Sequence, residues 1–321
     1  MARIDALIRM FPKTPLMILM ALFGLSGCAS HHGAPDRAAP AWPDTGYDVT
    51  RDLIYTPDDW PEKLAADLYL PTQTRAGGNP TVLLVHGGGW ERRSREDMDG
   101  IAEDLASRGF AVLNIDYRFA PQHTFPAQLH DLQLAMHWLH DQAEQYDLDT
   151  GRISAFGFSS GAHLVALMAL VASSDSELNA PHGGPETRPI AVVAGGIPAD
   201  LRAFGSGKLI RQFLGGEQPD MPEVYSQASP ITHVTDNAPP FFLFHGAMDM
   251  LVPAKQARWL RDELNHHGIE NEFYEMHLRG HLTSFLTSGS AVDRATDFLL
   301  RHTALAAASQ SAQTAAGSTQ Q

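Results

Sequence analysis

Apolar runs of strand length alternate with amphipathic stretches of helix length along most of the chain. The strand-length runs are Thr81–Val85, Phe110–Ile115, Ile153–Phe156, Ile190–Val193, Phe241–Phe244 and Glu272–Met276. The helix-length stretches are Ser94–Arg108, Pro126–Tyr146, Ser160–Leu170, Pro253–His267 and Ser284–His302. Such alternation predicts an α/β fold with a mostly parallel central sheet and helices on both faces, preceded by an antiparallel strand pair around Tyr47–Tyr55 and Leu64–Leu70. Ligands of such sheets bind beyond the carboxyl ends of the strands.

The first 28 residues have the pattern of a targeting segment. Basic residues precede the apolar stretch Leu16–Phe23, which is too short to cross a bilayer at about 1.5 Å per residue. We therefore predict that residues 1–27 form a signal peptide. The stretch Leu25-Ser-Gly-Cys28 resembles the lipobox of bacterial lipoproteins, whose cysteine is lipidated and becomes the first residue of the mature chain. The alternative is an ordinary cleaved signal with an incidental cysteine.

Cys28 is the only cysteine, so the rest of the chain has no thiol to pair in an oxidising compartment. This favours a lipid-anchored protein of the bacterial cell envelope, and Ala29 is typical of sorting to the outer membrane. Small, polar and proline residues predict a flexible tether over residues 28–44. Residues 304–321, which are rich in Ala, Ser and Gln, are expected to be disordered. One catalytic domain remains at residues 45–303.

The formal net charge of −14 disfavours binding to nucleic acid and to anionic lipid headgroups. Membrane attachment is therefore expected only through lipid on Cys28. The Gly- and Pro-rich residues 198–240 interrupt the alternation and are expected to cross the carboxyl edge of the sheet, as a cap over a pocket or as an inert surface loop. The pairs His31-His32 and His266-His267 lack the spacing of a metal motif, so we predict no metal site.

Two adjacent serines stand between glycines in Gly157-Phe-Ser159-Ser-Gly161. This stretch matches G-x-S-x-G, with Ser159 in the position of a nucleophile, and it lies between a predicted strand and a predicted helix. The hydroxyl of such a serine points out of a tight corner, and the flanking glycines let neighbouring elements approach it. The alternative is a buried helix start with incidental serines.

A second glycine-rich stretch, His86-Gly-Gly-Gly-Trp90, follows the strand that ends at Val85. Consecutive glycines can bring backbone N–H groups to one point, as the stabilisation of a developing oxyanion requires. A phosphate-binding loop is the competing interpretation, but the Gly-Lys-Ser/Thr ending of such loops is missing.

A serine nucleophile needs a base, and the base needs a carboxylate that fixes its tautomer. His281 follows the last predicted strand and Asp249 follows the strand before it, so that the chain order is Ser, Asp, His. The rival bases are His277, His245, His163 and His86. The rival acids, Asp236 and Asp293, do not directly follow a strand.

Together these motifs resemble the hormone-sensitive-lipase-like carboxylesterases. The resemblance rests on His86–Trp90, on Asp116-Tyr-Arg-Phe-Ala-Pro121 and on the serine motif. Other stretches are closer to bacterial feruloyl-esterase-like relatives, namely Ser159-Ser-Gly-Ala-His163, Ala228-Ser-Pro-Ile-Thr-His-Val234 and Pro239-Pro-Phe-Phe-Leu-Phe-His-Gly246. Phe158 stands where the lipase-like group usually has Asp, which leaves the subfamily open.

This resemblance, which spans residues 45–302, implies an α/β-hydrolase fold. It implies Ser159 as nucleophile, His281 as base and Asp249 as the acid that orients it. The backbone N–H groups of Gly88, Gly89 and Ser160 would form the oxyanion hole, with Trp90 as a substitute donor or as part of the substrate pocket.

The expected activity is hydrolysis of a small or aryl carboxylic ester through an acyl-enzyme, without a cofactor. Two alternatives stay open. The first is an amidase or peptidase that uses the same three residues, and the second is a non-catalytic envelope lipoprotein on a hydrolase fold. The sequence does not define the acyl or alcohol part of the substrate.

Overall fold

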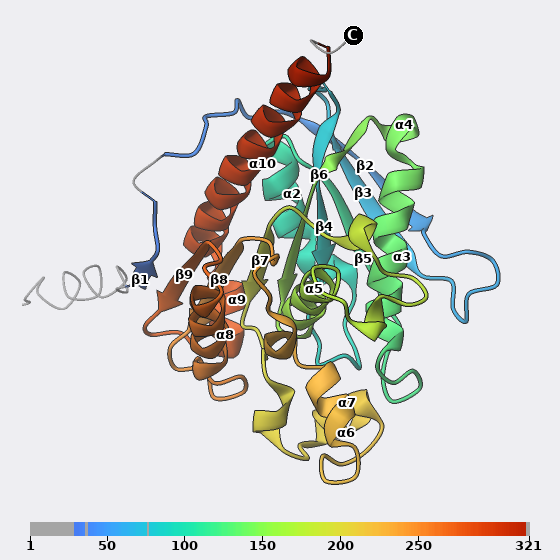
Figure 1. The fold of residues 1–321 in the computed structure, drawn as a ribbon, viewed down its shortest axis with the longest axis vertical. Coiled ribbons are helices and arrows are strands. Elements are labelled where there is room, and N and C mark those ends of the chain that lie inside the picture. The colour runs from blue at the N-terminus through green and yellow to red at the C-terminus, as the bar shows by residue number, and fades with distance from the viewer. Residues whose placement is uncertain (1–28, 36–37, 76, 319–321) are drawn as a thin grey trace, which may run out of the picture.

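The computed structural model describes residues 29–35, 38–75 and 77–318. Within them, nine strands form one sheet with the order β1-β9-β8-β7-β6-β4-β5-β3-β2 (Figure 1). The strands are β1 (Ala29–His32), β2 (Tyr47–Ile54), β3 (Ala65–Pro71), β4 (Asn79–Val85), β5 (Ala111–Ile115), β6 (Leu148–Phe158), β7 (Val192–Gly195), β8 (Phe241–Gly246) and β9 (Asn271–Met276). The predicted signal peptide and Cys28 lie outside the described residues.

Six neighbouring strands, from β9 to β5, run parallel to one another, while β1, β2 and β3 pair antiparallel. The expected early pair is therefore confirmed as β2 and β3, and the mostly parallel sheet is confirmed as well. The carboxyl ends of parallel strands meet at one edge, so Val85, Phe158, Gly246 and Met276 end at the same side of the sheet.

Helices cover both faces of the sheet and enclose two apolar cores (Figure 1). Helices α3 (Ala127–Asp141), α5 (Ser160–Val171) and α8 (Lys255–His266) pack on one face. Helices α2 (Asp99–Ser107) and α10 (Gly289–Ser318) pack on the other. Side chains alternate between the faces of a strand, and accordingly Leu83 of β4 lies in the first core and Leu84 in the second.

Three predicted helices are each divided in the structure. The stretch from Ser94 begins as the 3₁₀ turn η1 (Arg95–Met98) before α2, because the Arg95 guanidinium is drawn to the carboxylates of Asp67 and Asp116. The stretch predicted from Ser284 starts earlier, as α9 (His281–Leu286), and α10 follows it. This division matters for the site, since it makes His281 the first residue of a helix. The short helix α4 (Ala143–Tyr146) likewise follows α3.

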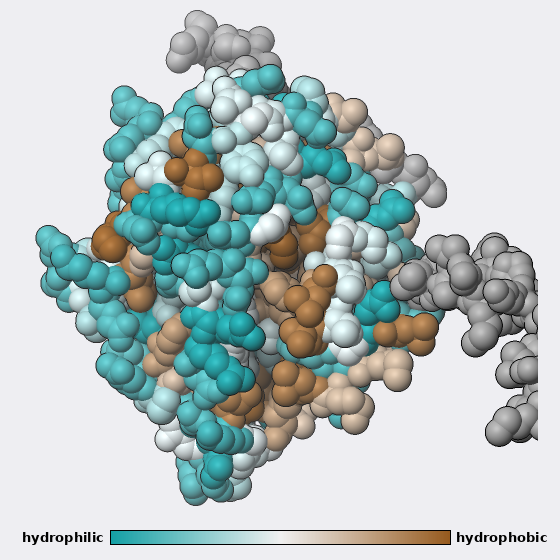
Figure 2. Space-filling model, turned by 180° about the vertical axis from the view of Figure 1, so that it is seen from behind, coloured by the Kyte–Doolittle hydropathy of each residue, from teal (hydrophilic) through white to brown (hydrophobic). Residues whose placement is uncertain are grey.

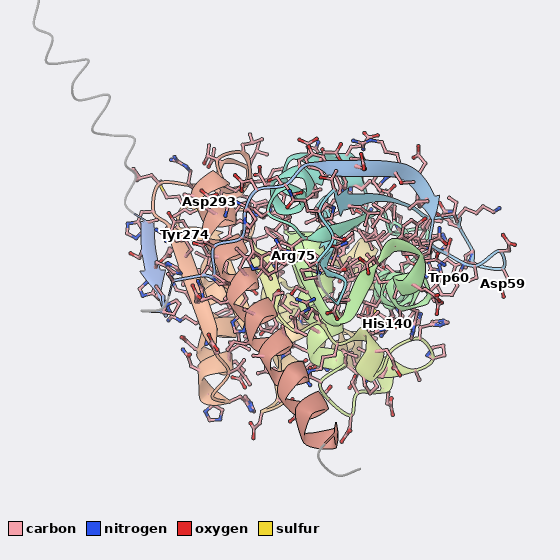
Figure 3. All side chains as sticks on the ribbon, turned by 90° about the horizontal axis from the view of Figure 1, so that it is seen from above. Asp59, Trp60, Arg75, His140, Tyr274 and Asp293 are labelled. Atoms are coloured by element: carbon pink, nitrogen blue, oxygen red, sulfur yellow. The ribbon has the colours of Figure 1, made fainter. Side chains whose placement is uncertain are left out.

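Both ends of the domain are more ordered than the sequence predicts. Residues 29–32 of the expected tether form β1, which lies beside β9 near the labelled Tyr274 (Figure 3). The Nε2 atom of His31 lies 2.8 Å from a Glu272 oxygen, a contact that composition alone does not reveal. The tail expected to be disordered from residue 304 continues α10 to Ser318. Its alanines explain this difference, since alanine has the highest helix propensity.

Residues 198–240 connect β7 to β8. This segment contains the helices α6 (Lys208–Leu214) and α7 (Pro222–Gln227) and the 3₁₀ turns η4 (Leu201–Phe204) and η5 (Pro230–His233). In Figure 1 the segment with α6 and α7 extends below the sheet. Several of its residues, from Pro198 to Ile210, line one wall of the cavity described below.

Candidate active site

A sharp backbone corner joins β6 to α5 at Ser159. Ser159 has φ 56° and ψ −119°, a conformation that costs energy for any residue other than glycine. A Cβ on Gly157 would lie 2.4 Å from the Gly161 backbone, and a Cβ on Gly161 would lie 2.2 Å from the Val85 carbonyl oxygen. Both flanking glycines are therefore required by the close approach of α5 to β6 and β4.

The two adjacent serines have different surroundings. The Oγ atom of Ser159 lies 2.8 Å from Nε2 of His281. Ser160 is buried, and its Oγ accepts the Gly89 N–H at 3.0 Å and lies 3.2 Å from the Tyr117 hydroxyl. The side chain of Ser160 thus holds the loop of Gly87, Gly88 and Gly89, here called the glycine loop, whereas the Ser159 hydroxyl faces the imidazole of His281.

The loops after β8 and β9 bring an acid behind that imidazole. The Nδ1 atom of His281 lies 2.6 Å from Oδ2 of Asp249, and Oδ1 of Asp249 accepts the N–H groups of Leu251 and Val252 at 2.9 and 2.8 Å. A carboxylate only accepts hydrogen bonds, so Nδ1 of His281 carries the hydrogen and Nε2 presents its lone pair to Ser159. Three loops far apart in sequence thus meet in one chain of hydrogen bonds.

Asp249 is held ionised by its neighbours. Burial acts to raise the pKa of this carboxyl, but donors from His245, His281 and the Val252 N–H outweigh it, so the pKa lies well below the usual range. The Nε2 atom of His245 lies 3.3 Å from Asp249 Oδ2 and 2.8 Å from the Val252 carbonyl oxygen. His245, which the sequence offered only as a rival base, therefore supports the acid instead.

The imidazoles of the other rival bases make no hydrogen bond to the Ser159 hydroxyl. His163 is fully buried between the indole N–H of Trp90 and the Ala228 carbonyl, and burial lowers its pKa to about 4. Burial also lowers the pKa of His86. The Nε2 atom of His277 lies 2.8 Å from the Ser30 hydroxyl oxygen, in the contact between β9 and β1.

The rival acids are likewise remote from the imidazole of His281. Asp236 pairs with His267 at 2.7 Å, and Asp293 lies near Arg108 at 3.9 Å. The structure thus brings Asp249, rather than either rival, to the base that faces Ser159.

The three expected oxyanion donors divide into two kinds. Among the described residues, the backbone N–H groups of Gly88 and Ser160 have no hydrogen-bond acceptor. Ser160 is the first residue of α5, so its N–H lies at the N-terminus of that helix. The N–H of Gly89 is instead directed at Ser160 Oγ. A Cβ on Gly87 would lie 3.2 Å from the Ser159 Cβ. The glycine loop therefore passes directly beside the backbone corner at Ser159, here called the elbow.

The side chain of Trp90 packs into the wall of the site. Its indole N–H donates to Nδ1 of His163 at 3.2 Å, and its ring stacks on Phe213 with the centroids 4.5 Å apart. The ring is 3% exposed and contributes only to the wall of the cavity. The indole N–H is therefore already engaged, whereas the backbone N–H of Trp90 has no acceptor among the described residues and stays a candidate substitute donor.

A mostly apolar cavity of about 600 Å³ opens in front of Ser159 and His281. Figure 2 shows a hollow on this face with hydrophobic side chains gathered around it. The apolar part of the wall includes Phe158, Phe204, Leu209, Ile210, Leu282 and Phe285. Such a cavity fits the apolar part of a small molecule.

The described residues hold no group of His, Cys, Asp and Glu side chains that could bind a metal ion. Within the same part of the chain, no helix has the length and apolar character that a membrane span requires.

Comparisons with known proteins place these features in a family. The BD-FAE family model matches residues 66–264, more than half of the chain. The esterase LipC of Mycobacterium tuberculosis is 34% identical over 187 residues, which are 56% of this chain and 46% of that protein. The probable carboxylic ester hydrolase LipM of the same organism is 30% identical over 202 residues, covering 60% of this chain and 47% of that protein. This chain thus spans about half the length of these curated relatives.

The fold is also found in solved structures. A truncated carbohydrate esterase from gut microbiota has a TM-score of 0.71 at 23% identity, with coverage of 83% of this chain and 99% of that chain. The predicted α/β-hydrolase fold is confirmed by this likeness and by the sheet order. The family match contains Ser159 and Asp249 but ends before His281, which the structure brings to them. On the family match and the fold together, the chain belongs to the BD-FAE family of α/β-hydrolases.

Proposed function

We propose that this protein is a serine carboxylesterase that hydrolyses a small or aryl carboxylic ester. The observation that carries the proposal is the hydrogen-bond chain from Ser159 Oγ through His281 to Asp249, with distances of 2.8 and 2.6 Å, at the wall of an apolar cavity. The esterase names of LipC and LipM support the same reaction class.

In the first half of the reaction, His281 Nε2 takes the proton of Ser159 as Oγ bonds to the ester carbonyl carbon. The carboxylate of Asp249 stabilises the imidazolium that forms. The oxygen of the tetrahedral intermediate accepts the N–H groups of Gly88 and Ser160, and its charge is favoured by the N-terminus of α5. The carbon–oxygen bond to the alcohol then breaks, and the alcohol leaves with the proton from His281.

The second half releases the acid. A water molecule loses a proton to His281 Nε2 and attacks the acyl carbon, and Ser159 leaves with that proton restored. No cofactor enters either half. The acyl or aryl group lies against the phenylalanines and leucines of the cavity, so substrate length is limited by the wall that residues 198–240 supply.

The test compares the two adjacent serines. Ser159→Ala lowers kcat about 10⁴-fold or more on a short aryl ester and abolishes labelling by a fluorophosphonate. Ser160→Ala is the matched control: it keeps the backbone N–H and loses only the anchor of the glycine loop, so it remains labelled and loses far less activity. An active Ser159→Ala protein would overturn the assignment.

An ester panel of varied acyl length, with feruloyl and acetyl-sugar members and matched amides, then defines the substrate. We expect esters to be hydrolysed and the matched amides to be poor substrates. Amide hydrolysis at an equal rate would favour an amidase or peptidase with the same three residues. Folded protein that neither reacts with fluorophosphonate nor hydrolyses any member would favour a binding protein.

We also propose that lipid on Cys28 anchors the protein in the bacterial cell envelope. The support is the Leu25–Cys28 lipobox pattern and the absence of a second cysteine. Lipid adds about 0.8 kcal/mol per buried CH₂, so several acyl chains anchor a protein without a spanning helix. Cys28→Ala should release the protein from membranes, and a variant that stays in the membrane fraction would contradict the anchor.

A further inference from the structure

Exposed apolar side chains gather on one side of the cavity mouth. In the part of the chain that the structure describes, ten large apolar side chains are exposed, and six of them lie on two neighbouring segments. These six, here called the apolar rim, are Met248, Met250, Leu251, Leu278, Leu282 and Leu286. Met250 is 92% and Leu286 68% exposed. Single exposed apolar residues are ordinary, but a contiguous group marks a binding surface.

The two segments of the apolar rim form one surface. The Met248 N–H donates to the Arg279 carbonyl at 2.9 Å, so the loop after β8 lies against the loop after β9. Leu251, Leu282 and Leu286 also line the cavity of Ser159 and His281. The apolar rim is therefore continuous with the entrance of the proposed active site.

The chain enters the described fold at this same edge. Ala29 pairs with Met276, the last residue of β9, and the Ser30 hydroxyl oxygen lies 2.8 Å from His277 Nε2. Cys28 precedes Ala29 directly, and consecutive Cα atoms are about 3.8 Å apart. A lipid on Cys28 would therefore hold the loop after β9, and with it the apolar rim, close to a bilayer.

The charges around the cavity favour the same orientation. Its charged wall residues are Arg92, Arg93 and Lys208 against one carboxylate, Asp97, in a protein whose formal net charge is −14. Arg93 lies 3.7 Å from Asp97, and Lys208 makes no ion pair within the described residues. Basic side chains are attracted to anionic lipid headgroups, whereas the remaining surface repels them.

We propose that the apolar rim docks on a phospholipid bilayer surface, with its leucines and methionines at the boundary of headgroups and acyl chains. The basic wall residues then face anionic headgroups, and substrate reaches Ser159 from the membrane side. The orientation rests on the proposed lipid at Cys28, whereas docking itself depends on the apolar rim and not on Ser159 chemistry. An inactive enzyme would still dock, so the two proposals fail separately.

The single cysteine permits a site-specific test. In a full-length Cys28→Ala background, Leu278→Cys is labelled with an environment-sensitive fluorophore and mixed with vesicles of phosphatidylcholine and phosphatidylglycerol. We expect a blue shift and quenching by brominated acyl chains. Ile54→Cys, on β2 at the opposite edge of the sheet, is the matched control and should show neither. Equal signals at both positions would overturn the proposal.

The affinity of the labelled protein for vesicles measures what the apolar rim contributes. Met250→Ser with Leu286→Ser should weaken vesicle binding about tenfold or more, because buried apolar area drives interfacial binding. Val49→Ser with Trp259→Ser removes two other exposed apolar side chains and should leave binding unchanged. Vesicles of phosphatidylcholine alone should bind more weakly, through loss of the attraction to basic side chains.

Two results would assign the apolar rim to another occupant. If the rim variant bound vesicles normally but lost self-association in sedimentation, the surface would be an interface between copies of this chain. If it bound normally and only raised KM for long-chain esters, the rim would be an extension of the substrate pocket. Either result would overturn membrane docking, and circular dichroism confirms that the variants compared are folded.

Discussion

The two halves of the candidate site are built in different ways. The glycine loop after β4 and the elbow after β6 are interlocked through their backbones, since a single Cβ on Gly161 would lie 2.2 Å from the Val85 oxygen. The acid and base loops after β8 and β9 also contact each other through the backbone, where the Met248 N–H donates to the Arg279 carbonyl. The contact that sets their chemistry, however, is between the side chains of His281 and Asp249. The outer face of these loops carries exposed leucines and methionines, while the residues on either side of Ser159 are buried.

The difference shows that the position of the Ser159 hydroxyl and the reactivity of the acid and base depend on different kinds of contact. Backbone packing sets where the Ser159 hydroxyl lies and leaves little freedom for change. Hydrogen bonds between side chains set the protonation state of the acid and base, and they respond to single substitutions without a change of fold. We call the glycine loop and the corner at Ser159 the first half of the site, and the acid and base loops its second half. Predictions about the second half therefore concern catalytic rate, whereas those about the first half concern catalytic rate and stability together.

The largest effect is expected in the second half, at the acid. Asp249→Asn keeps the shape of the side chain but removes the carboxylate that fixes the His281 tautomer, so kcat should fall about 10⁴-fold with little change in melting temperature. Steady-state kinetics and thermal unfolding measure the two quantities. Asp236→Asn, at the exposed rival acid that pairs with His267, is the matched control and should retain activity. A large loss in that control would refute the assignment of Asp249.

A substitution in the first half should affect stability as well. Gly161→Ala forces a Cβ against the Val85 and His86 carbonyl oxygens, and we expect a lower melting temperature together with a loss of kcat/KM of about a hundredfold or more. Gly100→Ala, also within a helix, meets no atom within 4 Å and should be neutral or stabilising by about 1 kcal/mol. Normal activity and stability in Gly161→Ala would show that close backbone packing does not fix the position of the elbow.

The parts of the molecule that the sequence predicts best are those where local pattern determines structure. Buried strands and the stripe of Leu129, Leu132 and Met136 on α3 follow from periodicity. The glycines of the elbow can be recognised in the sequence because few other residues permit so close an approach of backbone segments. The same local logic predicted that His281 and Asp249 would meet at one sheet edge, since parallel strands end together.

What the sequence leaves hidden depends on contacts between distant residues. β1 pairs with β9, where His31 contacts Glu272 and Ser30 contacts His277 just after the strand, although the composition of this segment is that of a tether. The direction of the Gly89 N–H toward Ser160 Oγ depends on side-chain packing that no pattern encodes. The apolar rim is likewise spread over two segments whose proximity only the fold reveals.

His245 offers a finer test of the second half, because it contacts Asp249 but not Ser159. His245→Leu removes the donor that lies between the Asp249 carboxylate and the Val252 carbonyl, so the acid is held less firmly. We expect kcat to fall about 10- to 100-fold with KM nearly unchanged. His245→Gln, which can still donate, should recover most of the rate. A loss confined to KM, or no rescue by Gln, would mean that His245 only fills space.

The smallest effect concerns stability at the first half, where His163 packs beneath the glycine loop. Burial lowers the pKa of His163 to about 4, from 6.5, so the unfolded chain binds a proton before the folded one as pH falls. The stability contributed by neutral His163 is thus complete above about pH 6.5 and is lost toward pH 4, a decrease of about 2 kcal/mol between pH 7 and pH 5. His163→Gln can still accept from Trp90 and donate to Ala228 but does not titrate, so urea unfolding should show a shallower dependence on pH in this range. If the variant and the wild type lost stability equally between these pH values, His163 would not be the group that makes the stability of this region depend on pH. The loops of Asp249 and His281 would then be the only part of the site whose properties are expected to depend on titrating side chains.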